Sequence, residues 1–249
     1  MDGASVAVHT WGDAAATPVL LWHGVGDDAA YFGPLAEVLA GEFGFRVVAP
    51  DAPGFGRSQA PPHRAAFHPA ALARFALRLL SELGVERCPF VGHSWGAGIG
   101  CHAAADAAQR VSALALLDGG YTELEDWGNP EEVARATESD WIAIGRERRV
   151  RDPMMWARAV RAALEPPTAA SVYPVLRSSR VPVLLLTADH SSRSDAGRAA
   201  ARGLGRFRHA LPEAEVRTLK GVGHDLPGDA GAVVGRVVGD FLARYRDSA

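Results

Sequence analysis

The sequence contains little of what several protein classes require. Among its 249 residues it has two cysteines, Cys88 and Cys101, and a single lysine, Lys220. Two cysteines are too few for a disulfide framework, which favours a reducing, cytoplasmic location. No apolar run reaches the roughly 18 residues that a membrane span needs. The first residues lack a basic segment followed by an apolar one, so we expect neither a signal peptide nor a membrane anchor.

Positive charge is not in excess either. The chain has 26 Lys and Arg against 29 Asp and Glu, a net charge of −3. Because nucleic acids and anionic membranes are held by strong basic fields, we expect neither as a partner. Hydrophobic residues make up 48% of the chain, which is typical of a folded globular protein. Arginine largely replaces lysine and alanine is abundant, which indicates a GC-rich, bacterial genome. The sequence does not indicate the oligomeric state.

Short apolar runs alternate with helical patterns along most of the chain. The central runs of Val, Leu and Ala lack polar alternation, which is typical of strands buried on both faces of a parallel sheet. We predict strands at residues 5–11, 18–22, 46–50, 89–93, 111–117, 182–187 and 215–219. We predict helices at residues 31–41, 69–83, 95–109, 195–210 and 230–245. This order predicts an α/β fold with a doubly wound, mostly parallel sheet.

One segment, residues 119–179, interrupts the alternation of strands and helices. It contains no convincing strand and carries three tryptophans, Trp127, Trp141 and Trp156. We predict that it forms an inserted group of short helices, a cap. Residues 1–118 and 180–249 are then the α/β core.

The strongest functional signal is the run Gly92-His93-Ser94-Trp95-Gly96, between an apolar strand and a helix of small residues. A serine in a sharp strand-to-helix turn projects its hydroxyl above the sheet, and the residues two before and two after it must be small. Gly92 and Gly96 meet that need. The N-terminus of the following helix offers N–H groups and a positive dipole end to a developing oxyanion. The run therefore predicts that Ser94 is a nucleophile.

On these residues the chain resembles the α/β-hydrolase superfamily, over nearly its whole length. The resemblance implies that His23-Gly24 opens an oxyanion loop and that the N–H groups of Val25 and Trp95 form the oxyanion hole. Residues 51–58 resemble the loop after the family's fourth strand. The cap occupies the family's insertion point after the sixth strand. His224, after the last predicted strand, has the position of the family's catalytic histidine.

The proposed chemistry requires a base, because a serine hydroxyl is a weak nucleophile near neutral pH. We predict that His224 takes the proton of Ser94 and later delivers it to the leaving group. His23 and His93 are expected to support loops. The other histidines, His190 among them, lie in no supporting pattern.

Two carboxylates are candidates for the acid that orients His224. In most family members the acid follows the seventh strand, where matching Ala188 to the usual glycine places Ser191 at the expected position and Asp189 two residues early. The other arrangement places the acid after the sixth strand, where Asp118 lies. We favour Asp118, with Asp189 as the alternative.

The cap is expected to cover Ser94 and to set specificity. The residues expected to bind substrate are Gly24, Phe32, Tyr121, Trp127 and Trp141. No Walker-type loop, dinucleotide fingerprint or metal-ligand cluster stands out in the sequence, so we expect a small-molecule substrate, no cofactor and no metal.

These expectations predict a serine hydrolase that cleaves an ester, thioester or lactone of a small to medium apolar acid through an acyl-enzyme on Ser94. The same groups also serve C–C bond hydrolysis, lyase chemistry, perhydrolysis and acyl transfer or cyclisation, which fold-level analogy does not separate. A third possibility is a receptor of this fold that binds a small molecule without turnover.

Overall fold

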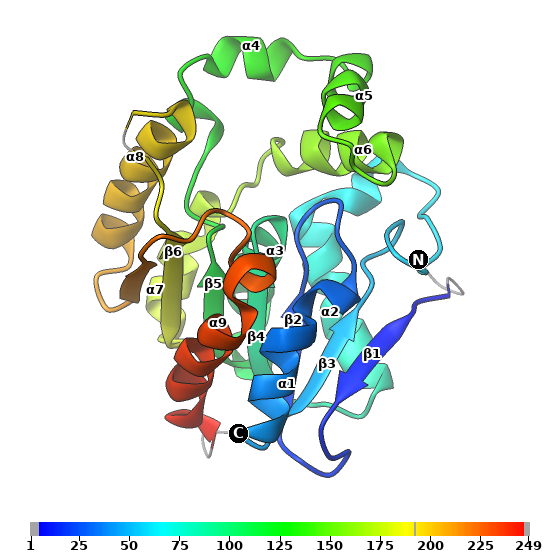
Figure 1. Cartoon of the computed structure of the whole chain (residues 1–249), viewed down its shortest axis with the longest axis vertical. Helices are drawn as coiled ribbons and strands as arrows, with labels where there is room; N and C mark the ends of the chain where they lie inside the picture. Colours follow the sequence, from blue (N-terminus) through cyan, green and yellow to red (C-terminus); the bar gives the residue numbers. More distant parts are fainter. Residues whose placement is uncertain (1–4, 192, 247–249) are drawn as a thin grey trace.

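The computed structural model describes residues 5–191 and 193–246 and has three layers, a twisted sheet between two layers of helices (Figure 1). Within the described residues the sheet has seven strands in the order β1-β3-β2-β4-β5-β6-β7. The strands are β1 (Val8–Trp11), β2 (Pro18–Trp22), β3 (Arg46–Pro50), β4 (Cys88–His93), β5 (Val111–Leu117), β6 (Val183–Ala188) and β7 (Glu215–Leu219). Only the edge strand β1 is antiparallel to its neighbour, which is β3.

Two apolar clusters cover the two faces of this sheet. On one face, Val19 and Leu21 of β2 pack among residues of α1 (Gly33–Gly41) and α9 (Leu226–Ala243). On the other face, Leu20 and Trp22 pack among residues of the helices α2 (Pro69–Glu82), α3 (Trp95–Asp106), α7 (Tyr173–Ser179) and α8 (Asp195–Ala210). Successive strand residues are thus buried on opposite faces, which explains the continuous apolar runs in the sequence. The predicted fold class is confirmed.

Element boundaries differ from the sequence prediction mainly where proline and glycine are close together. Helix α9 begins at Leu226, four residues before the predicted start, and it contains a kink at Ala230. Proline is tolerated in the first helical turn because the N–H that it lacks has no partner there. The run Pro227-Gly228 therefore lies within the first turn of α9, although its composition predicts a loop. Near the N-terminus, the predicted helix over residues 31–41 is divided into a 3₁₀ turn, Ala29–Phe32, and α1.

The segment between β5 and β6 contains α4 (Pro130–Arg135), α5 (Glu138–Glu147), α6 (Pro153–Ala163) and then α7. In Figure 1, α4, α5 and α6 lie above the upper end of the sheet, whereas α7 lies beside the sheet. The packing of α7 against α3 and α8 favours a cap that ends before Tyr173. The division into residues 119–179 and a core of 1–118 with 180–249 stays a prediction. In the described part of the chain, none of the helices combines the length and the apolar character needed to span a bilayer.

Candidate active site

Ser94 occupies a strained turn between β4 and α3. Its backbone angles are φ 53° and ψ −114°, a region that L-residues rarely adopt. A Cβ at Gly92 would lie 2.2 Å from the carbonyl oxygen of Gly96, and a Cβ at Gly96 would lie 2.2 Å from that of Trp22. Any side chain at either glycine would push the turn open. The two positions that the sequence pattern singled out are therefore the ones that the turn requires to be glycine.

A third glycine, which the sequence analysis did not identify, closes the turn from a neighbouring strand. A Cβ at Gly119 would lie 2.2 Å from the carbonyl oxygen of Ser94 and 2.6 Å from its Cα. Gly119 directly follows Asp118, so the loop after β5 passes against the backbone of the serine. The Asp118-Gly119-Gly120 run was the available signal, because consecutive glycines after a buried strand indicate a close backbone approach.

Three side chains from three loops form a continuous hydrogen-bonded chain. The Ser94 hydroxyl Oγ lies 3.0 Å from His224 Nε2, and His224 Nδ1 lies 2.7 Å from Asp118 Oδ2. Asp189 is exposed and takes no part in this series of hydrogen bonds, because its Oδ2 accepts a hydrogen bond from the Gly221 N–H instead. The structure therefore brings Ser94, His224 and Asp118 together and leaves Asp189 apart.

The Asp118 side chain is only 1% exposed, yet its surroundings favour the ionised form. Burial alone would raise the pKa of this carboxyl. The hydrogen bonds from His224 and from the Ala188 N–H outweigh burial and hold the pKa of Asp118 below its ordinary value. A carboxylate at this place accepts the Nδ1–H of His224, which leaves His224 Nε2 free to accept the proton of Ser94.

Two buried histidines support the loops around Ser94, as the sequence predicted. His23 donates from Nδ1 to the Gly24 carbonyl oxygen at 2.7 Å and accepts at Nε2 from the Ala52 N–H at 2.8 Å. His93 donates from Nε2 to the carbonyl oxygen of His224 at 2.9 Å. Burial lowers the pKa of His93 to about 4, so His93 stays neutral near neutral pH and connects the serine turn to the His224 loop.

The loop after β2 lies against the start of α3, where an oxyanion hole would form. A Cβ at Gly96 would come within 2.8 Å of the His23 carbonyl oxygen, which shows how closely the loop approaches the helix. Trp95 is the first residue of α3, so its N–H has no acceptor within the helix. Val25 lies two residues after His23 in the same loop. Their roles as oxyanion donors stay a prediction.

Asp27 is an ionisable group near Ser94 that the sequence analysis missed. Its Oδ2 would lie 2.8 Å from a Cβ at Gly24, in the loop after β2. Burial, reinforced by the carboxylates of Asp225 and Asp28, raises the pKa of Asp27 to about 6, while His224 acts in the opposite direction. The sequence offers little indication of a special role for this residue, since Asp27-Asp28 is typical of an ordinary polar loop.

We expect the Asp27→Asn variant to be stabilised relative to the parent protein more strongly at pH 8 than at pH 4.5. The folded-state pKa is raised, so the parent loses stability as the pH rises from about 4 through 6 and a buried carboxyl ionises. Asparagine does not ionise, and the gain at pH 8 should be about 1 kcal/mol after solvent screening. Thermal unfolding at both pH values measures it, with Asp13→Asn in the β1–β2 turn as the control. An equal shift in Tm at both pH values would contradict the prediction.

The five residues expected to bind substrate lie in different surroundings, and their binding roles stay a prediction. Phe32 is fully buried in the apolar cluster on the face of the sheet that α1 and α9 cover. Tyr121, 2% exposed, donates its hydroxyl to Asp118 Oδ1 at 2.9 Å. Gly24 is buried in the loop after β2, where its carbonyl oxygen accepts from His23 Nδ1. Trp127 is 39% exposed at the surface, and Trp141 lines a groove formed with α4. Loop position was the basis for Phe32 and Tyr121, and membership of the predicted cap was the basis for Trp127 and Trp141.

Trp156 of α6 packs against the loop after β2. Gly26 has φ +96°, and a Cβ there would lie 3.1 Å from Trp156 Cδ1. Trp156 is 6% exposed, and its ring lies 6.0 Å from the ring of Trp141. Helix α6 therefore packs on the loop that carries Val25 through a tryptophan–glycine contact.

Three potential metal ligands gather at the acid. Single ligand atoms of Asp118, His190 and His224 all lie within 4.8 Å of one another, and this is the group of three found among residues 5–191 and 193–246. Two imidazoles and a carboxylate form a common donor set for zinc. Hydrogen bonds already join these atoms, so the cluster is explained without an ion.

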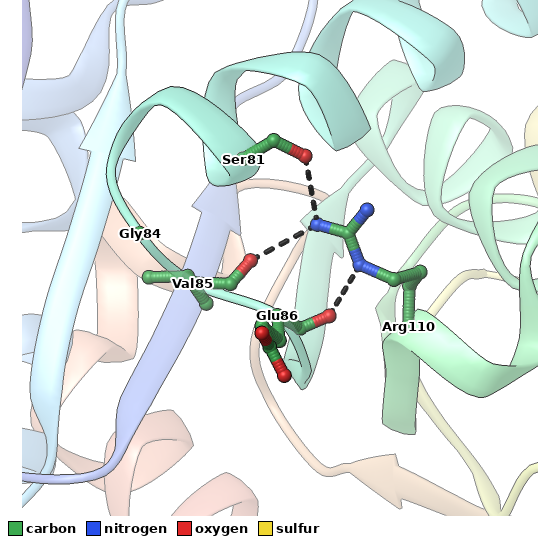
Figure 2. Close-up of a pocket in the computed structure, with 5 residues that line it drawn as sticks. All are labelled: Ser81, Gly84, Val85, Glu86 and Arg110. Atoms are coloured by element: carbon green, nitrogen blue, oxygen red, sulfur yellow. Dashed lines mark hydrogen bonds between the residues drawn. The ribbon is translucent and has the colours of Figure 1, made fainter.

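Two surface hollows lie away from Ser94. One, of about 440 Å³, lies at the amino ends of β4 and β5. Figure 2 shows its lining, where Arg110 donates to Ser81 Oγ and to the carbonyl oxygens of Val85 and Glu86. Ser94 follows the opposite end of β4. The second hollow, of about 1020 Å³, is the groove of α4 and α5 that includes Trp141. Neither hollow is lined by Ser94 or His224.

Comparison with known proteins gives a consistent result. The family model described as alpha/beta hydrolase fold matches residues 17–173, more than half of the chain. An acetyltransferase component of the acetoin cleaving system of Cupriavidus necator is 37% identical, covering 49% of this chain and 34% of that protein. Epoxide hydrolase A of Mycobacterium tuberculosis is 34% identical, covering 47% and 36%. The chain thus spans about a third of the length of these relatives. The enol-lactonase of Burkholderia xenovorans LB400 has the same fold, with a TM-score of 0.76, 21% identity and 97% coverage of both chains.

Proposed function

The chain belongs to the α/β-hydrolase fold family, and on that premise we propose that it is a serine hydrolase that works through an acyl-enzyme on Ser94. The substrate would be an ester, thioester or lactone of a small to medium apolar acid. Members of this family run several reactions, so the fold by itself supports only the general class.

The observation that carries the proposal is the hydrogen-bonded chain from Ser94 through His224 to Asp118. Its two contacts measure 3.0 Å and 2.7 Å, and they join residues 130 and 106 positions apart. A strained serine, a histidine with one nitrogen on the hydroxyl, and a buried carboxylate on the other nitrogen form the arrangement that activates a hydroxyl for attack. A binding protein without turnover has no need of this arrangement.

The reaction proceeds in two balanced halves. Ser94 Oγ attacks the substrate carbonyl while His224 Nε2 takes its proton, and the N–H groups of Val25 and Trp95 stabilise the oxyanion. The imidazolium, stabilised by Asp118, then protonates the leaving alkoxide or thiolate, and the acyl group stays on Ser94. In the second half, His224 takes a proton from water, the resulting hydroxide equivalent attacks the acyl-enzyme, and the acid is released as Ser94 recovers its proton.

The residue at the nucleophile position separates this chain from part of its family. Epoxide hydrolases and haloalkane dehalogenases resemble it in fold but use an aspartate at the turn, where this chain has Ser94. A serine forms an acyl ester rather than an alkyl ester, which supports acyl substrates.

A fluorophosphonate probe combined with a series of acyl substrates tests the proposal. We expect stoichiometric labelling of Ser94, detected by peptide mass spectrometry, and hydrolysis of p-nitrophenyl esters, thioesters or lactones that the label abolishes. Labelling without hydrolysis of any member would direct attention to the other acyl chemistries, which product analysis with peroxide or amine acceptors separates. Hydrolysis that continues after complete labelling would contradict the acyl-enzyme mechanism.

A further inference from the structure

Asp118 accepts hydrogen bonds from more groups than a catalytic acid needs. Besides His224 Nδ1 on Oδ2, it accepts the Tyr121 hydroxyl at 2.9 Å and the Ala188 N–H at 3.0 Å, both on Oδ1. The fourth donor is His190, whose Nε2 lies 2.8 Å from Oδ2 and 3.0 Å from Oδ1. A carboxylate offers about four lone-pair sites. All of them are used, and His190 shares Oδ2 with His224.

The orientation of His190 follows from its partner. Both oxygens of an ionised carboxylate only accept hydrogen bonds, so the Nε2 of His190 carries a hydrogen and donates it. The His190 side chain is 20% exposed while that of Asp118 is 1% exposed. The imidazole therefore covers Asp118 on the side of the β6 loop, as His224 does on the side of the β7 loop.

Holding the β6 loop in place does not require His190. The neighbouring Asp189 donates its N–H to the Val222 carbonyl oxygen at 2.8 Å, and its Oδ2 accepts from the Gly221 N–H at 3.0 Å. The Ala188 N–H already connects the end of β6 to Asp118. Because three hydrogen bonds from backbone N–H groups already fix the loop, the His190 side chain acts mainly on the charge and position of Asp118.

We propose that His190 is a positioning residue for the Asp118–His224 pair, which holds the carboxylate against His224 and limits the negative charge that the carboxylate offers it. This inference rests on the proposed function, in which His224 is the base. Each donor to a carboxylate draws charge away from the others. With His190 in place, Asp118 offers less charge to His224, so removal of the His190 imidazole should make His224 hold its proton more tightly.

Other titratable groups around the pair have to be separated from His190. Burial raises the pKa of Tyr121 and lowers that of His93 to about 4, so both stay neutral around pH 6. Asp27, whose pKa is raised by burial to about 6, changes its charge in the same range as a histidine and acts on His224. Asp225 interacts with Asp27 and has a pKa raised by burial. The test is therefore run in both the parent chain and the Asp27→Asn background.

The decisive measurement is the pKa of His224, followed by NMR of histidine labelled with ¹³C at Cε1, in the parent chain and in two variants, His190→Leu and His190→Gln. We expect His190→Leu to raise the pKa of His224 by roughly half a unit or more, since the charge of Asp118 then acts on one imidazole. His190→Gln keeps a donor but never gains a charge. The pKa of His224 in that variant should therefore lie between its values in the parent chain and in His190→Leu. His209→Gln, an exposed histidine on α8, is the matched control and should change nothing.

Kinetics give a second, independent reading. His190→Leu should lower kcat about tenfold with little change in KM, and His190→Gln should restore most of it, because a charge-assisted donor has been returned. In an Asp118→Asn background the His190→Leu change should have no further effect. An unchanged or lowered pKa of His224 in folded His190→Leu would overturn the proposal. The NMR titration needs no turnover, so it decides this point even if the hydrolase function itself fails.

Discussion

Replacing Ser94 by alanine is expected to lower kcat for an acyl ester by about 10⁴-fold or more while the fold persists. Removal of the nucleophile from such a triad leaves only the contribution of oxyanion stabilisation and binding. The Ser94 hydroxyl contacts His224 at 3.0 Å, and alanine preserves the glycine contacts that shape the turn. Turnover of a p-nitrophenyl ester and thermal unfolding of the same samples measure both parts of the prediction.

The chain offers a matched control for that substitution. Ser178 is exposed on α7 and donates its hydroxyl to the Pro174 carbonyl oxygen within the same helix. Ser178→Ala should keep full activity and bind the fluorophosphonate probe at Ser94. If Ser94→Ala retained more than about a hundredth of the parent activity after contamination is excluded, Ser94 would not be the nucleophile, since loss of a triad nucleophile reduces activity far more.

The second large effect is expected from Asp118→Asn, with Asp189→Asn as its control. Asparagine would turn an N–H or a weaker acceptor toward His224 Nδ1, which favours the wrong tautomer and removes the charge that stabilises the imidazolium. In a serine protease triad this change lowers kcat about 10⁴-fold. The same carboxylate also accepts from Tyr121, Ala188 and His190, so the variant should in addition be less stable.

Asp189→Asn should leave turnover within about threefold of the parent, because it only replaces an exposed acceptor of the Gly221 N–H. The pair of variants distinguishes the two acids that the sequence left open. Loss of activity in Asp189→Asn with an active Asp118→Asn would reverse the assignment. Circular dichroism and thermal unfolding of both variants separate a loss of chemistry from a loss of structure.

Local sequence rules succeeded where a few neighbouring residues determine the structure. The sharp turn at Ser94 is predictable from its immediate neighbours, because its close backbone contacts leave no room for a Cβ at positions 92 and 96, where the sequence has glycine. The continuous apolar runs predicted strands buried on both faces, and two core clusters cover those faces. Helix α8 begins and ends at the predicted residues, 195 and 210, since Ser194 caps it through the Gly197 N–H.

What the sequence by itself determined is the fold class, the strained serine and the loop in which His224 lies. Only the tertiary structure decided that Asp118 rather than Asp189 contacts His224, that Tyr121 and His190 also bind Asp118, and that Trp156 rests on Gly26. The reason is one of range. Turn sterics act over about five residues, whereas Asp118 meets residues 72 and 106 positions away, through the register of parallel strands that no local pattern encodes.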